Sequence, residues 1–349
     1  SDHYNLLGAA NDADALKLYL MKAGARSAET LRRYDREITR FTAYLYLELK
    51  INYQRVRLKH LQNYLRFIQN LPFHWTTQGL LPGQPARVLF KSSIKPGKST
   101  DQVIDVLSSF FSFLEKSRYI SGNPAAVLTR SGEKIARGSS VIRYFYDSDW
   151  DYIKKCLDEL PCKTLGQRLE AKRSKYIISL SYGLALRESE LTNHSCSDIY
   201  PDNDGGYYLS VLGKGKKRRN IPLNPKLHET IEQFRGEFDL SGLVGNNFPL
   251  APRKRMLNNN IATLSARGLR QWWRTFMSYC EDKADLELKT RLSKMPFHAL
   301  RHTALTHLAR RMDIEDLAIF AGHESIQTTS QYYHAEISRL KKMSADHYI

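Results

Sequence analysis

A polar segment without apolar periodicity, between Thr129 and Ser140, constrains the fold of this chain more than any other feature. Glycine, serine and basic residues are prominent in it, whereas regularly spaced apolar residues occur on both sides. Such segments typically lie between domains. A chain of 349 residues also exceeds what one compact core usually contains. We therefore predict two domains, residues 1–128 and residues 144–349, joined by a basic linker over residues 129–143.

The first domain has the residue spacing of helices. An apolar stripe with three- and four-residue intervals follows the N-cap candidate Ser27 and contains Leu31, Tyr34, Ile38, Phe41 and Leu45. We predict further helices that begin near Asp12, cover residues 57–69 and start at Ser99. Between the last two lies a proline-rich stretch, residues 71–98, which we interpret as a long irregular loop.

The face opposite that stripe is basic. It carries Arg32, Arg33, Arg36 and Arg40, a pattern that fits a solvated helix face as well as a face that contacts phosphates. The chain as a whole has 53 Lys+Arg against 36 Asp+Glu, a formal charge of +17. Such a surplus favours an anionic partner, with nucleic acid ahead of an anionic membrane surface. Charged residues interrupt every long apolar stretch, which excludes a membrane span.

Cysteines and the first residues of the chain indicate a reducing compartment. The four cysteines are scattered and none forms a CxxC pair, so we expect no disulfide framework. Residues Ser1 through Gly8 lack a basic stretch followed by an apolar one, and we therefore expect no secretory signal.

The second domain combines helices with a hairpin. Asp147 begins a helix that reaches Leu160, and a strongly apolar helix covers residues 172–186. Two β-favouring arms, residues 207–212 and 217–223, flank Gly213-Lys214-Gly215-Lys216, which predicts a β-hairpin. Further helices begin at Ser265 and follow Phe297 and Ile314. The fold class is therefore mainly α with a small antiparallel sheet.

Two clusters in this domain contain side chains that can support catalysis. His298, Arg301 and His302 are neighbours at helical spacing. His323 follows Gly322, a candidate for the helix C′ position, and precedes Ser325, a candidate N-cap, so we place it in a turn between two helices.

Metal binding and metal-free phosphoryl transfer compete for these histidines. His298 and His302 have the spacing of zinc ligands. The glutamate that a metallohydrolase places after its first histidine is absent, however, and Arg301 between the two ligands would repel a dication. Phosphoryl transfer instead needs fixed guanidinium and imidazole donors for the negative transition state. A tyrosine can then act as nucleophile and a lysine can protonate the leaving hydroxyl. We therefore expect no metal.

Four sequence boxes resemble the tyrosine recombinase (phage integrase) family in their order and approximate spacing. They are Ala185-Leu186-Arg187-Glu188-Ser189-Glu190-Leu191; Gly213-Lys214-Gly215 followed by Arg219 and Ile221-Pro222-Leu223; His298-x-x-Arg301-His302; and Gly322-His323-x-Ser325-Ile326-x-Thr328-Thr329 ahead of Tyr332. The resemblance extends from Asp147 to the C-terminus. The first third is similar to the family's core-binding domain in character only.

The resemblance implies a role for each matching residue. Arg187 and Arg301 would hold the scissile phosphate, with His323 as a further donor. Glu190 and His302 match supporting positions and would orient the arginines. Tyr332 would be the nucleophile, although the adjacent Tyr333 keeps the choice between the two open. Lys214 would protonate the leaving 5′ hydroxyl, and His298 would assist proton transfer at the tyrosine.

The resemblance also implies a reaction and its partners. A 3′-phosphotyrosine would preserve the bond energy, so that neither ATP nor a metal cofactor is needed. The partners would be duplex DNA with specific core sites, a homotetramer on two sites that forms a Holliday junction, and accessory DNA-bending proteins. The C-terminal segment through Ile349 would dock on a neighbouring subunit. We expect the cytoplasm, with the bacterial nucleoid, as the location. Integration, excision and dimer resolution all remain open as the biological task.

Three alternative functions remain open, and one surface is expected to bind DNA. A topoisomerase-like nicking-closing enzyme and a hairpin-end resolvase would use the same chemistry, whereas an inactive DNA-binding protein would use none. The residues that we expect to grip the DNA backbone are the four arginines of the first basic face together with Lys216, Lys217, Arg218, Arg267 and Arg270. Base readout depends on side chains that the sequence does not identify.

Overall fold

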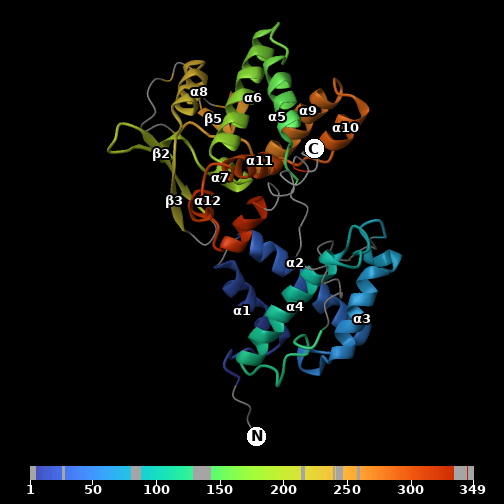
Figure 1. Ribbon diagram of the computed structural model, residues 1–349. Coiled ribbons are helices and arrows are strands. Elements are labelled where there is room, and N and C mark those ends of the chain that lie inside the picture. Colours follow the sequence, from blue (N-terminus) through green and yellow to red (C-terminus); the bar gives the residue numbers. More distant parts are fainter. Residues whose placement is uncertain are drawn as a thin grey trace. The chain divides into compact units, whose positions relative to one another are not determined.

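The computed structural model describes residues 5–25, 28–79, 88–128, 143–213, 217–238, 240, 247–257, 260–333 and 344. The chain divides into two compact units, Ser1–Gly138 and Ser139–Ile349 (Figure 1). The predicted linker lies outside the described residues except for Arg143, whose guanidinium donates to the carbonyl of Lys294 at 3.2 Å. The N-cap candidate Ser27 and the C-terminal segment after Tyr333, except Ser344, also lie outside them.

The described part of the first unit is helical. Its longer helices are α1 (Asp12–Gly24), α2 (Ala28–Tyr44), α3 (Leu58–Gln69) and α4 (Lys98–Lys116), and its short ones are η1 (Leu45–Leu49), η2 (Tyr53–Arg55) and η3 (Phe73–Trp75). The predicted stripe of α2 faces the core, because Ile38, Phe41 and Leu45 are fully buried. The predicted proline-rich loop contains η3 and an isolated parallel bridge between Thr76 and Phe90.

The four arginines of α2 do not share one environment. Arg32, Arg33 and Arg36 are exposed, as a basic outer face requires. Arg40 is only 13% exposed at its side chain. Its guanidinium lies over the ring of Phe90 at 4.1 Å and donates to the carbonyl of Leu89 at 2.7 Å. The loop before α4 therefore covers the end of α2, which the helical spacing alone does not reveal.

The second unit buries one face of helix α6 in its core and leaves the other face exposed. In chain order its elements are α5 (Asp147–Asp158), α6 (Leu165–Gly183), α7 (Glu188–Asn193), η5 (Cys196–Asp198), β1 (Ile199–Pro201), β2 (Tyr207–Leu212), β3 (Arg218–Pro222), α8 (Pro225–Gly236), β4 (Pro252–Leu257), β5 (Asn260–Thr263), α9 (Ala266–Glu281), α10 (Leu286–Leu292), α11 (Ala299–Leu308) and α12 (Ile314–Ala321). Residues 326–333 form a further helix. The fold class is confirmed: mainly helical with small antiparallel sheets.

The predicted hairpin is present with a defined register. Strands β2 and β3 pair antiparallel, with Val211 opposite Arg219 and Leu212 opposite Arg218. Strand β1 adds to the other edge of β2. The second hairpin, β4 and β5, was not predicted, because Pro252 and the basic residues Arg253, Lys254 and Arg255 do not have the alternation of a strand.

Two apolar clusters hold the second unit together. The larger cluster includes Tyr176, Ile177 and Leu180 of α6 together with Trp273 of α9. A smaller cluster joins α11, α12 and the last helix, and consists of Ala185, Ala304, Leu305, Ala309, Leu317, Ala321 and Tyr332. This smaller cluster holds α11, which contains Arg301 and His302, next to Tyr332 of the last helix.

Two further observations concern the described residues. All four cysteines are free, and Cys162 is the exposed one. None of the described helices is both long and apolar enough to cross a lipid bilayer.

Candidate active site

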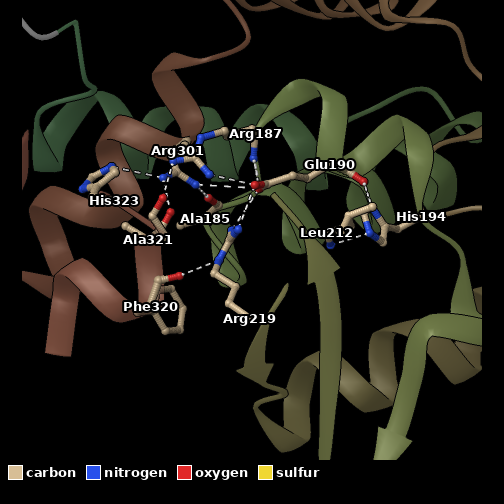
Figure 2. A network of polar contacts seen from close by, with 11 residues as sticks. Ala185, Arg187, Glu190, His194, Leu212, Arg219, Arg301, Phe320, Ala321 and His323 are labelled. Atoms are coloured by element: carbon tan, nitrogen blue, oxygen red, sulfur yellow. Dashed lines mark hydrogen bonds and ion pairs between the residues drawn. The ribbon is translucent and has the colours of Figure 1, made fainter. Parts of the chain in front are cut away.

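A buried carboxylate lies at the centre of the site (Figure 2). Glu190 is in the first turn of α7 and is 3% exposed. Its carboxylate accepts from the backbone N–H and the guanidinium of Arg187 at 2.8 Å each. Arg219 of β3 binds it in a bidentate fork at 2.8 and 2.9 Å. Arg301 Nη1 lies 3.9 Å from Oε2. Three guanidinium groups therefore share one carboxylate.

Electrostatics keep this carboxylate ionised. Burial by itself raises the pKa of Glu190, but the hydrogen bonds and charge of Arg219, followed by those of Arg187, outweigh it and lower the pKa to about 2. Glu190 is consequently a permanent anion at neutral pH, and it fixes the planes of the surrounding guanidinium groups.

Arg301 is held by backbone carbonyls. The side chain is 2% exposed, and it donates to the carbonyls of Ala185 and, at 2.6 Å, Ala321. Ala185 has a φ of 45°, a left-handed conformation that is uncommon outside glycine and turns its carbonyl toward Arg301. Burial and the neighbouring Arg187 lower the pKa of Arg301 to about 10, so the guanidinium stays charged at neutral pH.

The turn after α12 is tied to the same arginines. Gly322 ends the helix with a φ of 62°, and its carbonyl accepts from Arg187 Nη2 at 2.8 Å. Arg219 Nε donates to the carbonyl of Phe320 at 3.1 Å. A Cβ at position 322 would lie 2.9 Å from Arg219 atoms, so the close approach requires glycine. This turn positions His323.

His323 is a neutral imidazole in this arrangement. Arg301 Nη2 is 3.2 Å from its Nε2, and Thr329 Oγ1 is 2.9 Å from its Nδ1. Because a guanidinium can only donate, Nε2 accepts and Nδ1 carries the proton. Burial, Arg301 and Arg187 lower the pKa of His323 to about 4.

Tyr332, and not Tyr333, faces this cluster. Tyr332 is 1% exposed; its ring stacks on His323 at 6.0 Å between centroids and its hydroxyl is 2.9 Å from Nδ1 of His302. Burial raises the pKa of Tyr332, and Arg301 and Arg187 partly offset the increase. The Tyr333 hydroxyl instead donates to the carbonyl of Met312 at 2.6 Å.

His298 and His302 lie at the start of α11 and in its first turn, next to each other. His302 does not contact the arginine forks that it was expected to orient; its ring lies against Tyr332. His298 precedes α11, is exposed, and packs edge-on against His302 at 4.6 Å. No hydrogen bond joins its imidazole to another described residue. Among the described residues, no group of three or more His, Cys, Asp or Glu is arranged to hold a metal.

Lys214 and Lys216 lie outside the described residues. The hairpin that carries them is nevertheless anchored beside Glu190. His194 Nδ1 bonds the carbonyl of Glu190 at 2.9 Å, and its Nε2 accepts from the backbone N–H of Leu212 at 2.9 Å. The remaining basic residues predicted to contact DNA are exposed: Lys217, Arg218, Arg267 and Arg270.

Sequence reasoning assigned no role in the site to Arg219 or His194. Arg219 stands in the run Lys217-Arg218-Arg219, which is typical of a solvated arm. The available signal was strand alternation, because neighbours in a strand point to opposite faces. Arg218 is exposed, whereas Arg219 turns inward toward Glu190.

The sequence profile of the Phage integrase family matches residues 157–339. The chain belongs to the phage integrase family.

Members of the phage integrase family resemble the chain along most of its length. The tyrosine recombinase XerC of Staphylococcus haemolyticus is 26% identical over 318 residues, which cover 91% of this chain and 90% of the relative. The tyrosine recombinase XerC of Thermodesulfovibrio yellowstonii is 30% identical over 258 residues, which cover 73% and 78%. The chain is thus a tyrosine recombinase, as its sequence boxes indicated.

Solved structures share the fold at low sequence identity. The XerH recombinase bound to palindromic difH matches with a TM-score of 0.61 and 16% identity over 97% of this chain and 85% of that one. A lambda integrase dimer bound to a COC′ core site gives 0.55 and 17% over 93% and 77%. The Tn1549 transposon integrase with transposon end DNA gives 0.57 and 16% over 95% and 99%.

Proposed function

We propose that this tyrosine recombinase cuts and rejoins duplex DNA at specific sites through a 3′-phosphotyrosine on Tyr332. The observation that carries the proposal is the position of one tyrosine hydroxyl beside the histidines of a cluster in which Arg187 and Arg301 flank a buried carboxylate. Attack by Tyr332 on a phosphodiester leaves a free 5′ hydroxyl, and a partner strand's hydroxyl then releases the enzyme. The phosphotyrosine preserves the bond energy.

The charge of the cluster suits a phosphate. Three arginines and Glu190 leave a net charge of +2, because the neighbouring His302 and His323 are neutral at pH 7. A phosphodiester carries one negative charge, and its transition state spreads more over the non-bridging oxygens. A preorganised cation that needs no reorientation lowers that barrier most effectively. Arg187, which is the most exposed of the three guanidiniums, is the group that meets the phosphate first.

Lys214 is proposed as the general acid for the leaving 5′ hydroxyl, and His298 as a further donor. His323 becomes a donor to the phosphate only when its Nε2 leaves Arg301 and gains a proton. The anchoring of β2 and β3 to α7 supports the lysine's role, since Leu212 and Arg219, on the two strands that flank Lys214 in the sequence, are both tied to α7 and the residue that follows it. The ring of Tyr332 is almost fully buried, so DNA entry must be accompanied by a local shift that exposes the hydroxyl.

The partner is duplex DNA, as it is in the solved complexes of XerH and lambda integrase. We propose a tetramer on two core sites, a Holliday junction intermediate and accessory DNA-bending proteins, in the cytoplasm with the chromosome. The name of the Tn1549 transposon integrase supports integration or excision of a mobile element as the task, and resolution of joined molecules is the alternative.

Covalent capture tests the proposal. Duplexes with a randomised central sequence and one nick serve as suicide substrates, because cleavage beside the nick releases a short strand and blocks rejoining. We expect an SDS-resistant protein–DNA adduct in EDTA that is lost in Tyr332→Phe and retained in Tyr333→Phe. An adduct that persists in Tyr332→Phe would refute the nucleophile. An adduct that EDTA abolishes would assign the chemistry to a metal.

A further inference from the structure

The hydroxyl of Tyr332 has one hydrogen-bond partner among the described residues, and it is a histidine without an assigned role in proton transfer. His302 Nδ1 lies 2.9 Å from Tyr332 Oη. The two rings are 5.8 Å apart between centroids with 36° between their planes. This distance is that of a strong N···H–O hydrogen bond, so Nδ1 is the nearest basic atom to the atom that attacks.

The surroundings of His302 fix the direction of that bond. His298, Arg301 and His323 all oppose a positive charge on its ring, and together with burial, the largest cause, they lower the pKa of His302 to about 3. Burial raises the pKa of Tyr332 at the same time. Donor and acceptor are therefore unambiguous at neutral pH: Oη carries the proton and Nδ1 accepts it.

The pair is preorganised by the packing of α11. The residues that follow His302 in this helix, Thr303, Ala304 and Leu305, are buried. Leu305 and Tyr332 also belong to the same apolar cluster. The orientation of the His302 ring relative to Tyr332 thus follows from the core of the second unit and not from a mobile surface side chain.

We propose that His302 is the catalytic base for Tyr332. As the Tyr332 Oη–P bond forms and the P–O5′ bond breaks, the proton of Oη passes to Nδ1 of His302. The leaving O5′ takes its proton from the general acid on the other side of the phosphate. In rejoining, a 5′ hydroxyl attacks the phosphorus and gives its proton back to the deprotonated general acid, the Oη–P bond breaks, and His302 returns its proton to Oη. The inference rests on the proposed function.

A bound phosphate makes this transfer feasible. The imidazolium that forms on His302 would be unfavourable in the free protein, since its neighbours are His298, Arg301 and His323. The phosphate adds negative charge beside those same groups and favours the protonated ring. His298, which is exposed and packs edge-on against His302, is then available to the phosphate oxygens.

The same hydrogen bond has a competing explanation. Because Tyr332 is buried, His302 could hold the nucleophile in a closed resting position. The two explanations predict opposite results when His302 is replaced: a base gives slower cleavage, and a latch gives faster cleavage. The experiment therefore needs the rate of the chemical step.

The test measures single-turnover formation of the adduct on a duplex captured by the wild-type protein. His302→Asn is the main variant, because its amide oxygen can still accept the Tyr332 proton in a hydrogen bond but cannot take it up. His302→Gln is the second variant. Each duplex is made with the natural oxygen and with sulfur at the bridging 5′ position. A thiolate needs no proton to leave, so sulfur restores variants that lack the general acid.

The matched control is another histidine of the same helix. His307 Nδ1 is 2.8 Å from the hydroxyl of Tyr182, an equivalent pair outside the site. We expect His302→Asn and His302→Gln to slow adduct formation about 100-fold or more on both duplexes, with DNA affinity unchanged. His307→Asn should stay within about threefold of the wild type, and Lys214→Ala should recover on the sulfur duplex.

Three results would overturn the inference. They are faster cleavage by the His302 variants, rates of His302→Asn or His302→Gln within about threefold of the wild type, and restoration of these variants by the sulfur duplex. Failure of the proposed function has a separate signature. In that case the wild type forms no adduct on any duplex, or Tyr332→Phe still forms one, whatever the His302 variants do.

Discussion

At the residue scale, the site depends on the ionised state of Glu190. One carboxylate with four hydrogen bonds from Arg187 and Arg219 holds segments that are distant in sequence. The side chain is almost completely buried, so its charge is compensated by protein groups and not by water. Removing one partner of a buried ion pair destabilises the fold more than having no ion pair there at all, since the remaining charges stay buried without a partner.

Replacing the carboxylate by an amide should therefore destabilise the fold. We expect Glu190→Gln to lower the free energy of unfolding at pH 7 by about 3 kcal/mol, measured by urea denaturation. The exposed Glu229, which accepts from Gln233 on α8, is the control. Glu229→Gln should change stability by less than about 0.5 kcal/mol. Equal stability of the wild type and Glu190→Gln would contradict the shared-carboxylate arrangement.

The pH dependence of this difference has a defined sign. The pKa of Glu190 is lowered in the folded state to about 2, from about 4.3 in an unfolded chain. Because the pKa is lower in the folded state, the ionised carboxylate contributes fully to the free energy of unfolding at pH values above its pKa in the unfolded chain. The contribution is lost as the pH falls toward 2. The gap between the wild type and Glu190→Gln should accordingly shrink in denaturation series between pH 5 and pH 3.

At the scale of elements, Arg219 connects the hairpin to the turn after α12. Its fork holds Glu190 of α7, while Nε holds the carbonyl of Phe320. Lysine cannot reproduce the planar fork or the third contact, although it preserves the charge. The turn that presents His323 thus depends on a residue of a strand about a hundred positions earlier.

Replacing Arg219 by lysine keeps the positive charge but removes the bidentate fork, so it separates the effects of the two. We expect Arg219→Lys to speed hydrogen exchange at the amide of His323, which donates to the carbonyl of Ala318 at 3.0 Å, by about tenfold. It should slow adduct formation by a similar factor. The neighbouring Arg218 is exposed and, among the described residues, hydrogen-bonds Ser210 alone, at 3.4 Å, so Arg218→Lys should change neither. Unchanged exchange in Arg219→Lys would show that the turn is held without the fork.

At the scale of the whole molecule, the surplus of positive charge divides into two classes. The candidate site contains three of the arginines, Arg187, Arg219 and Arg301, around Glu190. Arg40 is hydrogen-bonded inside the first unit. The exposed remainder, which includes Arg32, Arg33 and Arg36 of α2, is available to a DNA backbone. Contacts of that kind release counterions and weaken as salt rises.

Arg36 and Arg40 lie one helical turn apart on α2 and belong to different classes, so replacing each in turn tests the distinction. The side chain of Arg36 is 52% exposed and that of Arg40 is 13% exposed. We expect Arg36→Ala, which also removes the 2.8 Å ion pair with the buried Glu37, to reduce the slope of log affinity against log salt by about 1. Arg40→Ala should instead lower the free energy of unfolding by about 2 kcal/mol, measured by denaturation. An unchanged salt slope in Arg36→Ala would remove this face of α2 from the DNA interface.

Patterns of short range were predictable from the sequence. The apolar stripes of α2 and α9, the hairpin of β2 and β3, and the adjacency of His298 and His302 all depend on neighbours within a few residues. Periodicity and turn composition encode such contacts directly. The order of the sequence boxes also indicated the family, and the comparisons with known proteins confirm it. The strands β1, β4 and β5 escaped prediction because they are short or strongly charged.

Tertiary structure decided which of these residues meet. Arg187 reaches Gly322 across 135 positions, and Arg301 reaches Ala185 across 116. No local pattern selects Tyr332 over Tyr333, pairs His302 with that tyrosine, turns Arg219 inward or covers Arg40 with the loop before α4. Each outcome follows from the packing of helices and strands against the core of its own unit, where a side chain's partner is set by position in space and not by sequence spacing.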